Sequence, residues 1–154
     1  MIEWPKELPY PDLSGYALED APNVSRTEMA SGRARQRQMY TSVPSFVTLS
    51  WGMDQRQFEF FAAWVRWKLK DCTEWFTGWA QTAGPARQTE MRFVGSSSAP
   101  PYRARMDGPD YWRISARIEI RERQTLPKGW EDMASWIFMA DLFDIAMNRE
   151  WPEA

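Results

Sequence analysis

Histidine is absent from this chain, and cysteine occurs once, as Cys72. Without histidine there is no Ser-His-Asp or Cys-His relay, no imidazole metal ligand and no unperturbed side chain that titrates between about pH 5 and pH 8. A lone cysteine excludes an intrachain disulfide and a zinc site built from several cysteines. Only carboxylates remain as metal ligands, and we expect neither a metal nor a cofactor.

Long apolar runs and a strong charge excess are also missing. No window approaches the roughly 18 apolar residues of a membrane span, and residues 1–6 lack the basic and apolar segments of a secretion signal. The sequence therefore predicts a protein kept in a cytosol-like compartment, with no membrane span. A net charge of −2 gives no reason to expect specific nucleic-acid binding, which depends largely on neutralising phosphates.

Catalytic motifs are missing as well. There is no Gly-rich phosphate loop, residues 96–98 have no nucleophile-elbow context, and Cys72 has no visible activating base. Asp107 and Asp110 flank a turn, which aspartate commonly stabilises by itself. We expect that the chain is not an enzyme.

Aromatic residues are plentiful, with ten Trp, eight Phe and five Tyr among 154 residues. This length is typical of one domain with a single core and additional segments at both ends, and 44% hydrophobic residues are typical of a soluble fold. Most of the Trp residues are expected to be core or interface anchors. The alternative is a carbohydrate-binding or host-receptor-binding module that uses exposed Trp residues.

Three segments differ in composition. Residues 1–25 hold four prolines and are predicted to form an extended arm, whose aromatics pack either on the parent domain or on a neighbouring subunit. Residues 26–124 are predicted to form the core domain, a β-sandwich or split barrel. Residues 125–154 are predicted to contain an acidic amphipathic helix, because residues 130–154 hold six acids against Arg149, a net charge of −5.

Periodicity predicts the fold class. Alternation over residues 45–51, 89–94 and 112–121 is typical of half-buried antiparallel strands, and residues 112–121 carry the strongest such pattern. The predicted class is mainly β with flanking helices, an α+β fold. Its architecture would be an antiparallel β-sandwich or split barrel with one packed helix, an extended N-terminal arm and a C-terminal helix.

The packed helix is predicted over residues 54–69, with Asp54 as N-cap and Gln57 completing a capping box. Two apolar stripes follow this helix, one formed by Phe58, Phe61, Val65 and Leu69 and the other by Phe60, Trp64 and Trp67. One sheet face cannot cover both stripes. We therefore expect Trp64 and Trp67 to be exposed on the subunit and to contact a partner. We expect the same of Trp136 in the C-terminal helix.

Basic residues between positions 26 and 38 supply a second candidate interface. Arginines at period two put their guanidinium groups on one strand face, which indicates either a solvated strand edge or a carboxylate-bearing partner. The acidic C-terminal helix is a plausible complement. The candidate interface residues are Arg26, Arg33, Arg35, Arg37, Trp64, Trp67, Trp130, Met133, Trp136, Ile137 and Phe143.

The order of these motifs resembles a known family. Arg26 and Gly32 precede a basic strand, residues 47–50 lead into the helix, and Trp75-Phe76 and residues 112–119 follow as an aromatic and a closing strand. This arrangement resembles the minor tail proteins at the tail tip of long-tailed bacteriophages, the lambdoid M type, and the N-terminal domain of distal tail hub proteins. The resemblance covers about two-thirds of the chain.

The resemblance implies a structural virion protein, assembled in the host cytoplasm into a homo-oligomeric ring that connects the tail tube to the hub or baseplate. Its partners would be copies of itself and other tail proteins, with residues 130–151 and the arm at 1–22 docking on neighbouring subunits. Residues 70–74 depart from the family, which often has glycine there. The proline-rich arm and the C-terminal helix have no counterpart in its short members.

Overall fold

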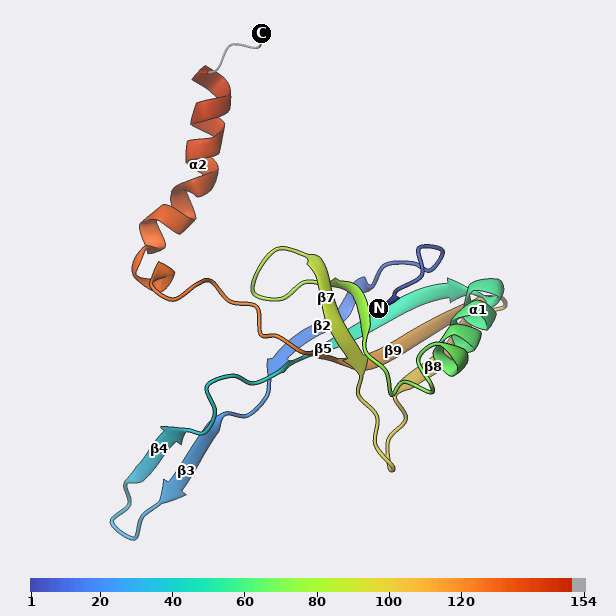
Figure 1. The fold of residues 1–154 in the computed structure, drawn as a ribbon, viewed down its shortest axis with the longest axis horizontal. Coiled ribbons are helices and arrows are strands. Elements are labelled where there is room, and N and C mark those ends of the chain that lie inside the picture. The colour runs from blue at the N-terminus through green and yellow to red at the C-terminus, as the bar shows by residue number, and fades with distance from the viewer. Residues whose placement is uncertain (151–154) are drawn as a thin grey trace. The chain divides into compact units, whose positions relative to one another are not determined.

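The computed structural model describes residues 1–150 and, within the last helix, the side chains as far as Leu142 and that of Ile145 (Figure 1). The chain forms two compact units, residues 1–123 and the residues from Gln124 onward. The elements are β1 (Ile2–Glu3), β2 (Asp12–Asp20), β3 (Val24–Glu28), β4 (Ala34–Gln38), β5 (Ser45–Asp54), α1 (Gln55–Trp67), β6 (Phe76–Ala80), β7 (Arg87–Phe93), β8 (Tyr102–Gly108), β9 (Tyr111–Ile120), the 3-10 turn η1 (Trp130–Asp132) and α2 (Ala134–Glu150).

The first unit is built on a seven-stranded sheet of order β1-β6-β7-β9-β5-β2, with β8 also paired to β9. β9 is its centre, because one side pairs with all of β5 while the other is divided between β8 and β7. Every pair is antiparallel except β1 with β6. The predicted class is confirmed: the chain is mainly β with two helices, one of them C-terminal.

The core lies on one face of this sheet. Ile114, Ile118 and Ile120 of β9 are fully buried, as are Val47 and Leu49 of β5. The residues between them carry the polar face, because successive side chains of a strand point to opposite sides. The alternation predicted for residues 45–51 and 112–121 is confirmed.

Helix α1 covers the core face. Asp54 accepts a hydrogen bond from the backbone N–H of Gln57, and the Gln57 side chain accepts one from the backbone N–H of Asp54, so the predicted capping box is present. Phe61 and Val65 are buried. Trp64, expected at an exposed interface, is buried with 7% of its surface accessible, so that expectation is wrong. The reason is that Trp4 and Phe76 pack against its ring, with centroids at 5.4 and 5.5 Å.

The N-terminal segment is extended and belongs to the same compact unit as the sheet. β1 and β2, both from this segment, form the two edges of the large sheet, and Leu8, which lies between them in the sequence, is buried. Trp4 and Tyr16 pack on the core cluster, so these aromatics lie on their own domain. The Tyr16 hydroxyl bonds the backbone of Gln81, which ties β2 to the segment after β6.

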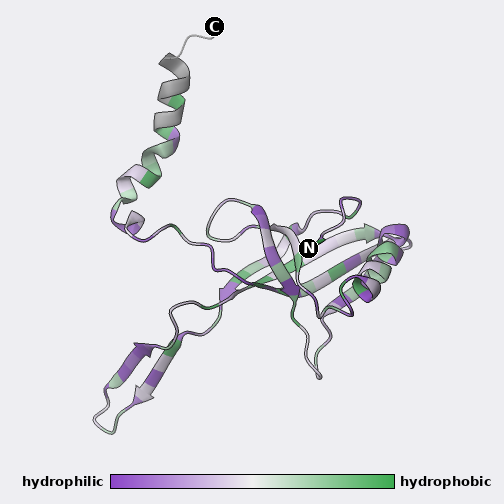
Figure 2. Cartoon of the chain, viewed as in Figure 1, coloured by the Kyte–Doolittle hydropathy of each residue, from purple (hydrophilic) through white to green (hydrophobic). Residues whose placement is uncertain are grey.

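Strands β3 and β4 form a separate two-stranded hairpin, which extends beyond the large sheet (Figure 1). Gly32 adopts a φ of 76° in its turn, a conformation that glycine reaches without steric cost. Every residue of the two strands is exposed except Ser25, which is half-buried. Figure 2 shows that hydrophilic residues run along both strands.

The second unit begins with the buried Gln124, continues through an exposed segment, turns at Gly129 and leads through η1 into α2. No helix in the described part of the chain is both long enough and apolar enough to cross a membrane.

Candidate functional site

The basic hairpin carries arginines on both of its faces. Residues opposite one another in an antiparallel ladder share a face, and Arg37 lies opposite Ser25 while Arg35 lies opposite Thr27. Arg26 lies opposite Gln36, on the other face. The expectation that the guanidinium groups share one face therefore holds for Arg35 and Arg37 and is wrong for Arg26, because β3 and β4 are two strands in a fixed register.

None of the hairpin arginines forms an ion pair with a side chain that the structure describes. Six of the eight arginines between positions 87 and 123 differ, because each has a carboxylate within 3.3 Å, whereas Arg87 and Arg103 form no ion pair with a described side chain. These pairs are Arg92–Glu119, Arg105–Asp107, Arg113–Asp12, Arg117–Glu19, Arg121–Glu90 and Arg123–Asp20. The basic charge of the hairpin is thus left available to another molecule.

The outer face of α1 is a second candidate surface. Trp67 is 73% exposed and Phe60 is 47% exposed, and the exposed Ala63 lies between them. The Arg66 guanidinium stacks on the Trp67 ring at 5.0 Å from its centroid. Trp67 is therefore where the sequence predicts it, on the surface.

The second unit presents the third surface. Trp130 and Met133 are each nearly half exposed, Trp136 is 69% exposed, and Ile137 is half-buried. Phe138, Met139, Leu142 and Ile145 are exposed as well. The side chain of Phe143, a candidate interface residue, lies outside the described residues. The sequence thus predicts the exposed Trp130, Met133 and Trp136, but its candidate interface residues do not include the exposed Phe138, Met139, Leu142 and Ile145.

An apolar groove that the sequence did not predict lies at the β2 edge. Tyr10, Leu13, Tyr16 and Trp79 line it together with small residues, and its volume is about 340 Å³. Tyr10 and Trp79 meet edge to face, with ring planes at 83°. They form a corner, whereas a flat sugar-binding platform needs coplanar rings.

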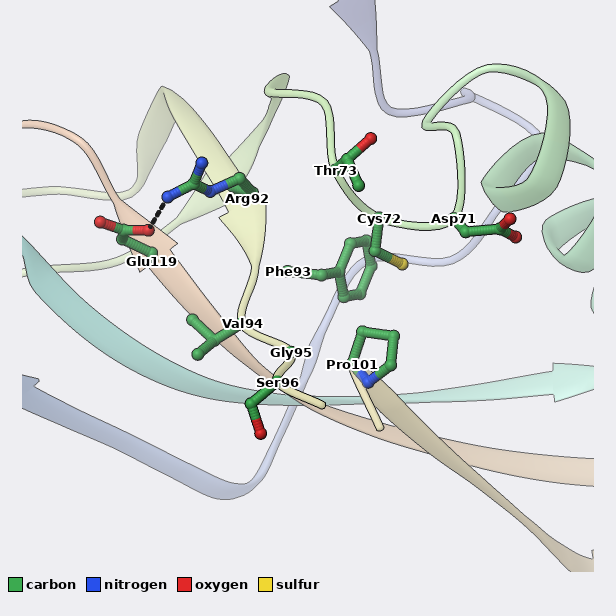
Figure 3. A pocket seen from close by; sticks show the side chains of 10 residues that line it. All are labelled: Asp71, Cys72, Thr73, Arg92, Phe93, Val94, Gly95, Ser96, Pro101 and Glu119. Carbon is green, nitrogen blue, oxygen red and sulfur yellow. Dashed lines mark hydrogen bonds and ion pairs between the residues drawn. The ribbon is translucent and has the colours of Figure 1, made fainter. Parts of the chain in front are cut away.

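A cavity of about 490 Å³ lies beside the turn that follows α1 (Figure 3). Cys72 is buried at its wall near Phe93, and the Arg92–Glu119 ion pair lies on the other side. Burial, with a smaller effect of the Asp71 charge, raises the pKa of the Cys72 thiol to about 12. The thiol is therefore protonated at neutral pH and is a poor nucleophile.

The carboxylate of Asp107 lies between two arginines, Arg105 and Arg113. A hydrogen bond from Arg113, helped by the charge of Arg105, lowers the pKa of Asp107 below its usual value. These contacts hold the β8–β9 hairpin, in agreement with the structural role that the sequence indicates for Asp107. No cluster of three or more potential metal ligands occurs among the described residues.

Comparison with known proteins identifies no relative: no family model, curated protein or solved structure matches this chain. The candidate functional sites are therefore the three exposed surfaces described above. They are the basic hairpin, the outer face of α1 and the apolar second unit.

Proposed function

We propose that this chain is a structural component of a bacteriophage tail, a tail-tip or distal-tail subunit that forms a ring connecting the tail tube to the hub or baseplate. It acts by binding copies of itself and other tail proteins, without catalysis, and works in the virion after assembly in the host cytoplasm. The motif order over Arg26–Arg123 and the mainly β fold with a packed helix support this proposal.

The basic hairpin is the observation that carries the proposal. An isolated two-stranded ribbon is marginally stable in water, and this one pairs with no third strand in the described chain. Its arginines have no described carboxylate partner. A basic hairpin that pairs with no third strand in its own subunit is stabilised when a neighbouring subunit supplies both the packing surface and the carboxylates.

A ring also requires two different complementary surfaces on each subunit, because its contacts run head to tail. The chain offers such a pair of opposite character: the hairpin is basic, and residues 130–154 carry a net charge of −5 with several exposed aromatic side chains. Opposite charge steers the association, and buried aromatic area supplies affinity.

Light scattering on the purified full chain tests the proposal. We expect a molar mass of several subunits for the wild type and a smaller mass after deletion of residues 130–154 or after the double change Arg35→Glu/Arg37→Glu. The charge-matched control is Arg87→Glu/Arg103→Glu, two exposed arginines outside the hairpin, which should assemble as the wild type does. A wild-type chain that stays monomeric at every concentration, alone and with tail proteins, would refute the proposal.

A glycan array separates this function from the carbohydrate-binding alternative. The perpendicular Tyr10 and Trp79 rings give no flat platform, so we expect no glycan to bind. Specific binding that is lost in Trp79→Ala would favour the alternative.

A further inference from the structure

We propose that the outer face of α1 is the docking site for helix α2 of a second copy of this chain. This inference rests on the proposed self-assembly and names the two surfaces that meet. The face of α1 is defined by Arg56, Phe60, Ala63 and Trp67, and it is called the α1 stripe below.

The α1 stripe has the geometry of a helix-packing surface. Its four residues follow one another at intervals of four, three and four positions, so they lie along one side of the helix. Ala63 is small and lies between two large exposed aromatic rings. A small residue between large ones leaves a notch that a side chain of an opposing helix can fill.

Helix α2 has the surface that fits such a stripe. Trp136, Phe138, Met139, Leu142 and Ile145 are each at least 59% exposed. At 3.6 residues per turn these five side chains cover roughly half of the helix circumference. A water-exposed apolar area of that extent is typical of a protein-binding surface.

Charge favours the second copy as the occupant. Residues 55–70 contain four basic residues and one acid, a net charge of +3, and neither Arg56 nor Arg66 has an ion pair with a described side chain. The acids Glu131 and Asp132 lie just before α2, and Asp141 lies within it. Lys70 already pairs with Glu74, but Arg66 and Lys68 lie at the C-terminal end of α1 without an ion pair to a described side chain, so the charges favour antiparallel packing of the two helices.

The hairpin is a poorer counterpart for α2. Its exposed apolar side chains are Val24, Met29, Met39 and Tyr40, which lie at its ends, while the strands between them are polar and basic. Placing α2 there would leave much of its apolar arc against charged groups, which costs free energy. The α1 stripe offers apolar area and basic charge together, and the hairpin remains for other contacts in the ring.

Thiol crosslinking between two full-length variants tests the proposal. One variant carries Ala63→Cys and the other carries Met139→Cys, and a short bismaleimide reagent is added to the mixture. The native Cys72 is buried and protonated, so it leaves the engineered thiols as the reactive ones. We expect a crosslinked heterodimer, at a yield at least tenfold above a control mixture in which Arg103→Cys replaces Ala63→Cys.

Any other result would overturn the inference, and the crosslinked pair would show where α2 binds instead. A crosslink within one chain of the double variant, at high dilution, would mean that α2 covers its own α1. A crosslink of Met139→Cys to Arg35→Cys, and none to Ala63→Cys, would mean that α2 docks on the hairpin. Oligomers without an α1–α2 crosslink would refute the inference and leave the proposed function standing, whereas a strictly monomeric wild type would refute both.

A second measurement does not depend on crosslinking. Trp67→Ala should weaken self-association at least tenfold, as measured by sedimentation equilibrium, because a large aromatic anchor is removed. Trp79→Ala is the matched control, since Trp79 is also an exposed tryptophan but lies away from the stripe in β6, and it should leave the dissociation constant unchanged. Equal effects of the two changes would contradict the proposal.

Discussion

At the scale of single residues, the partly buried Trp4 covers one side of the aromatic core. Its ring stacks on Trp51 with centroids at 5.2 Å and also contacts Phe61, Trp64 and Phe76. A residue at the start of the chain thereby joins β5, α1 and β6. Stacked and edge-to-face aromatic pairs of this kind stabilise the fold beyond the area that they bury.

Replacing Trp4 by alanine should therefore be strongly destabilising. We expect Trp4→Ala to lower the free energy of unfolding by roughly 3–5 kcal/mol, because the change removes a large ring and leaves a cavity among four aromatic neighbours. Urea unfolding followed by circular dichroism measures it. The control is Trp67→Ala, at a 73% exposed position, which should change stability by less than about 0.5 kcal/mol in the monomer. Equal effects would mean that the Trp4 stack does not hold the core.

Cys72 provides a second prediction at this scale. Burial favours the neutral thiol and raises its pKa from 9.0 to about 12, so at pH 8 the thiolate is about a thousandfold rarer than in an unshifted thiol. We expect slow reaction with a thiol reagent in the native state and full reaction in urea. The exposed Ala63→Cys should react rapidly under native conditions. Fast native labelling of Cys72 would show that the site is open.

The raised pKa of Cys72 also determines how the stability of the fold depends on pH. Because the folded-state pKa of Cys72 lies above the unfolded value, its contribution to stability is complete below about pH 9. That contribution is lost as the pH rises toward about 12. Burial also raises the pKa values of Tyr16 and Tyr102, and these tyrosines act in the same alkaline direction.

At the scale of secondary-structure elements, two kinds of element behave differently. α1 has a complete N-terminal cap and a buried face, so local sequence and tertiary packing agree. The hairpin has a well-formed turn at Gly32 but buries almost nothing. The difference predicts that α1 is stable in the isolated subunit, whereas the hairpin opens readily.

The capping box gives the prediction at this scale. Asp54→Ala should cost about 1 kcal/mol of unfolding free energy, because it leaves the backbone N–H of Gln57 without its partner. Asp54→Asn keeps a side-chain oxygen at the same place and should cost clearly less. Chemical denaturation of the three proteins measures the difference. An Asn variant as unstable as the Ala variant would argue against the cap.

At the scale of the whole molecule, the chain divides into a packed unit and a second unit that buries little of its apolar surface. In α2, Trp136, Phe138, Met139, Leu142 and Ile145 each expose more than half of their surface. A protein of this kind is expected to behave poorly as an isolated subunit and to gain stability on assembly, because binding stabilises whichever state is bound.

Limited trypsin digestion tests this behaviour. In the dilute subunit we expect early cleavage in the exposed hairpin, after Arg33, Arg35 or Arg37, and after Lys128 in the exposed segment that precedes η1. Assembly should slow both cleavages at least tenfold, because the hairpin and the second unit become covered. Arg103 in β8, exposed but held in the large sheet, serves as the internal control. Cleavage at unchanged rates in the assembled protein would contradict the proposed interfaces.

The sequence by itself determined those strands and helix ends that depend only on residues close together in the chain. The alternation over residues 112–121 gives β9, and Asp54 with Gln57 gives the start of α1, because side-chain periodicity and capping need only neighbouring residues. The exposure of Trp67 also follows from helical spacing that exceeds what one sheet face can cover.

Only the tertiary structure decided which aromatics meet. Trp64 carries the same spacing signal as Trp67, yet it is buried because Trp4, 60 positions earlier in the chain, packs against it. The placement of Arg26 on one face of the hairpin and of Arg35 and Arg37 on the other likewise depends on strand register. Periodicity reports which side of an element a residue occupies, whereas burial depends on contacts between distant segments, and those contacts form only in the folded chain.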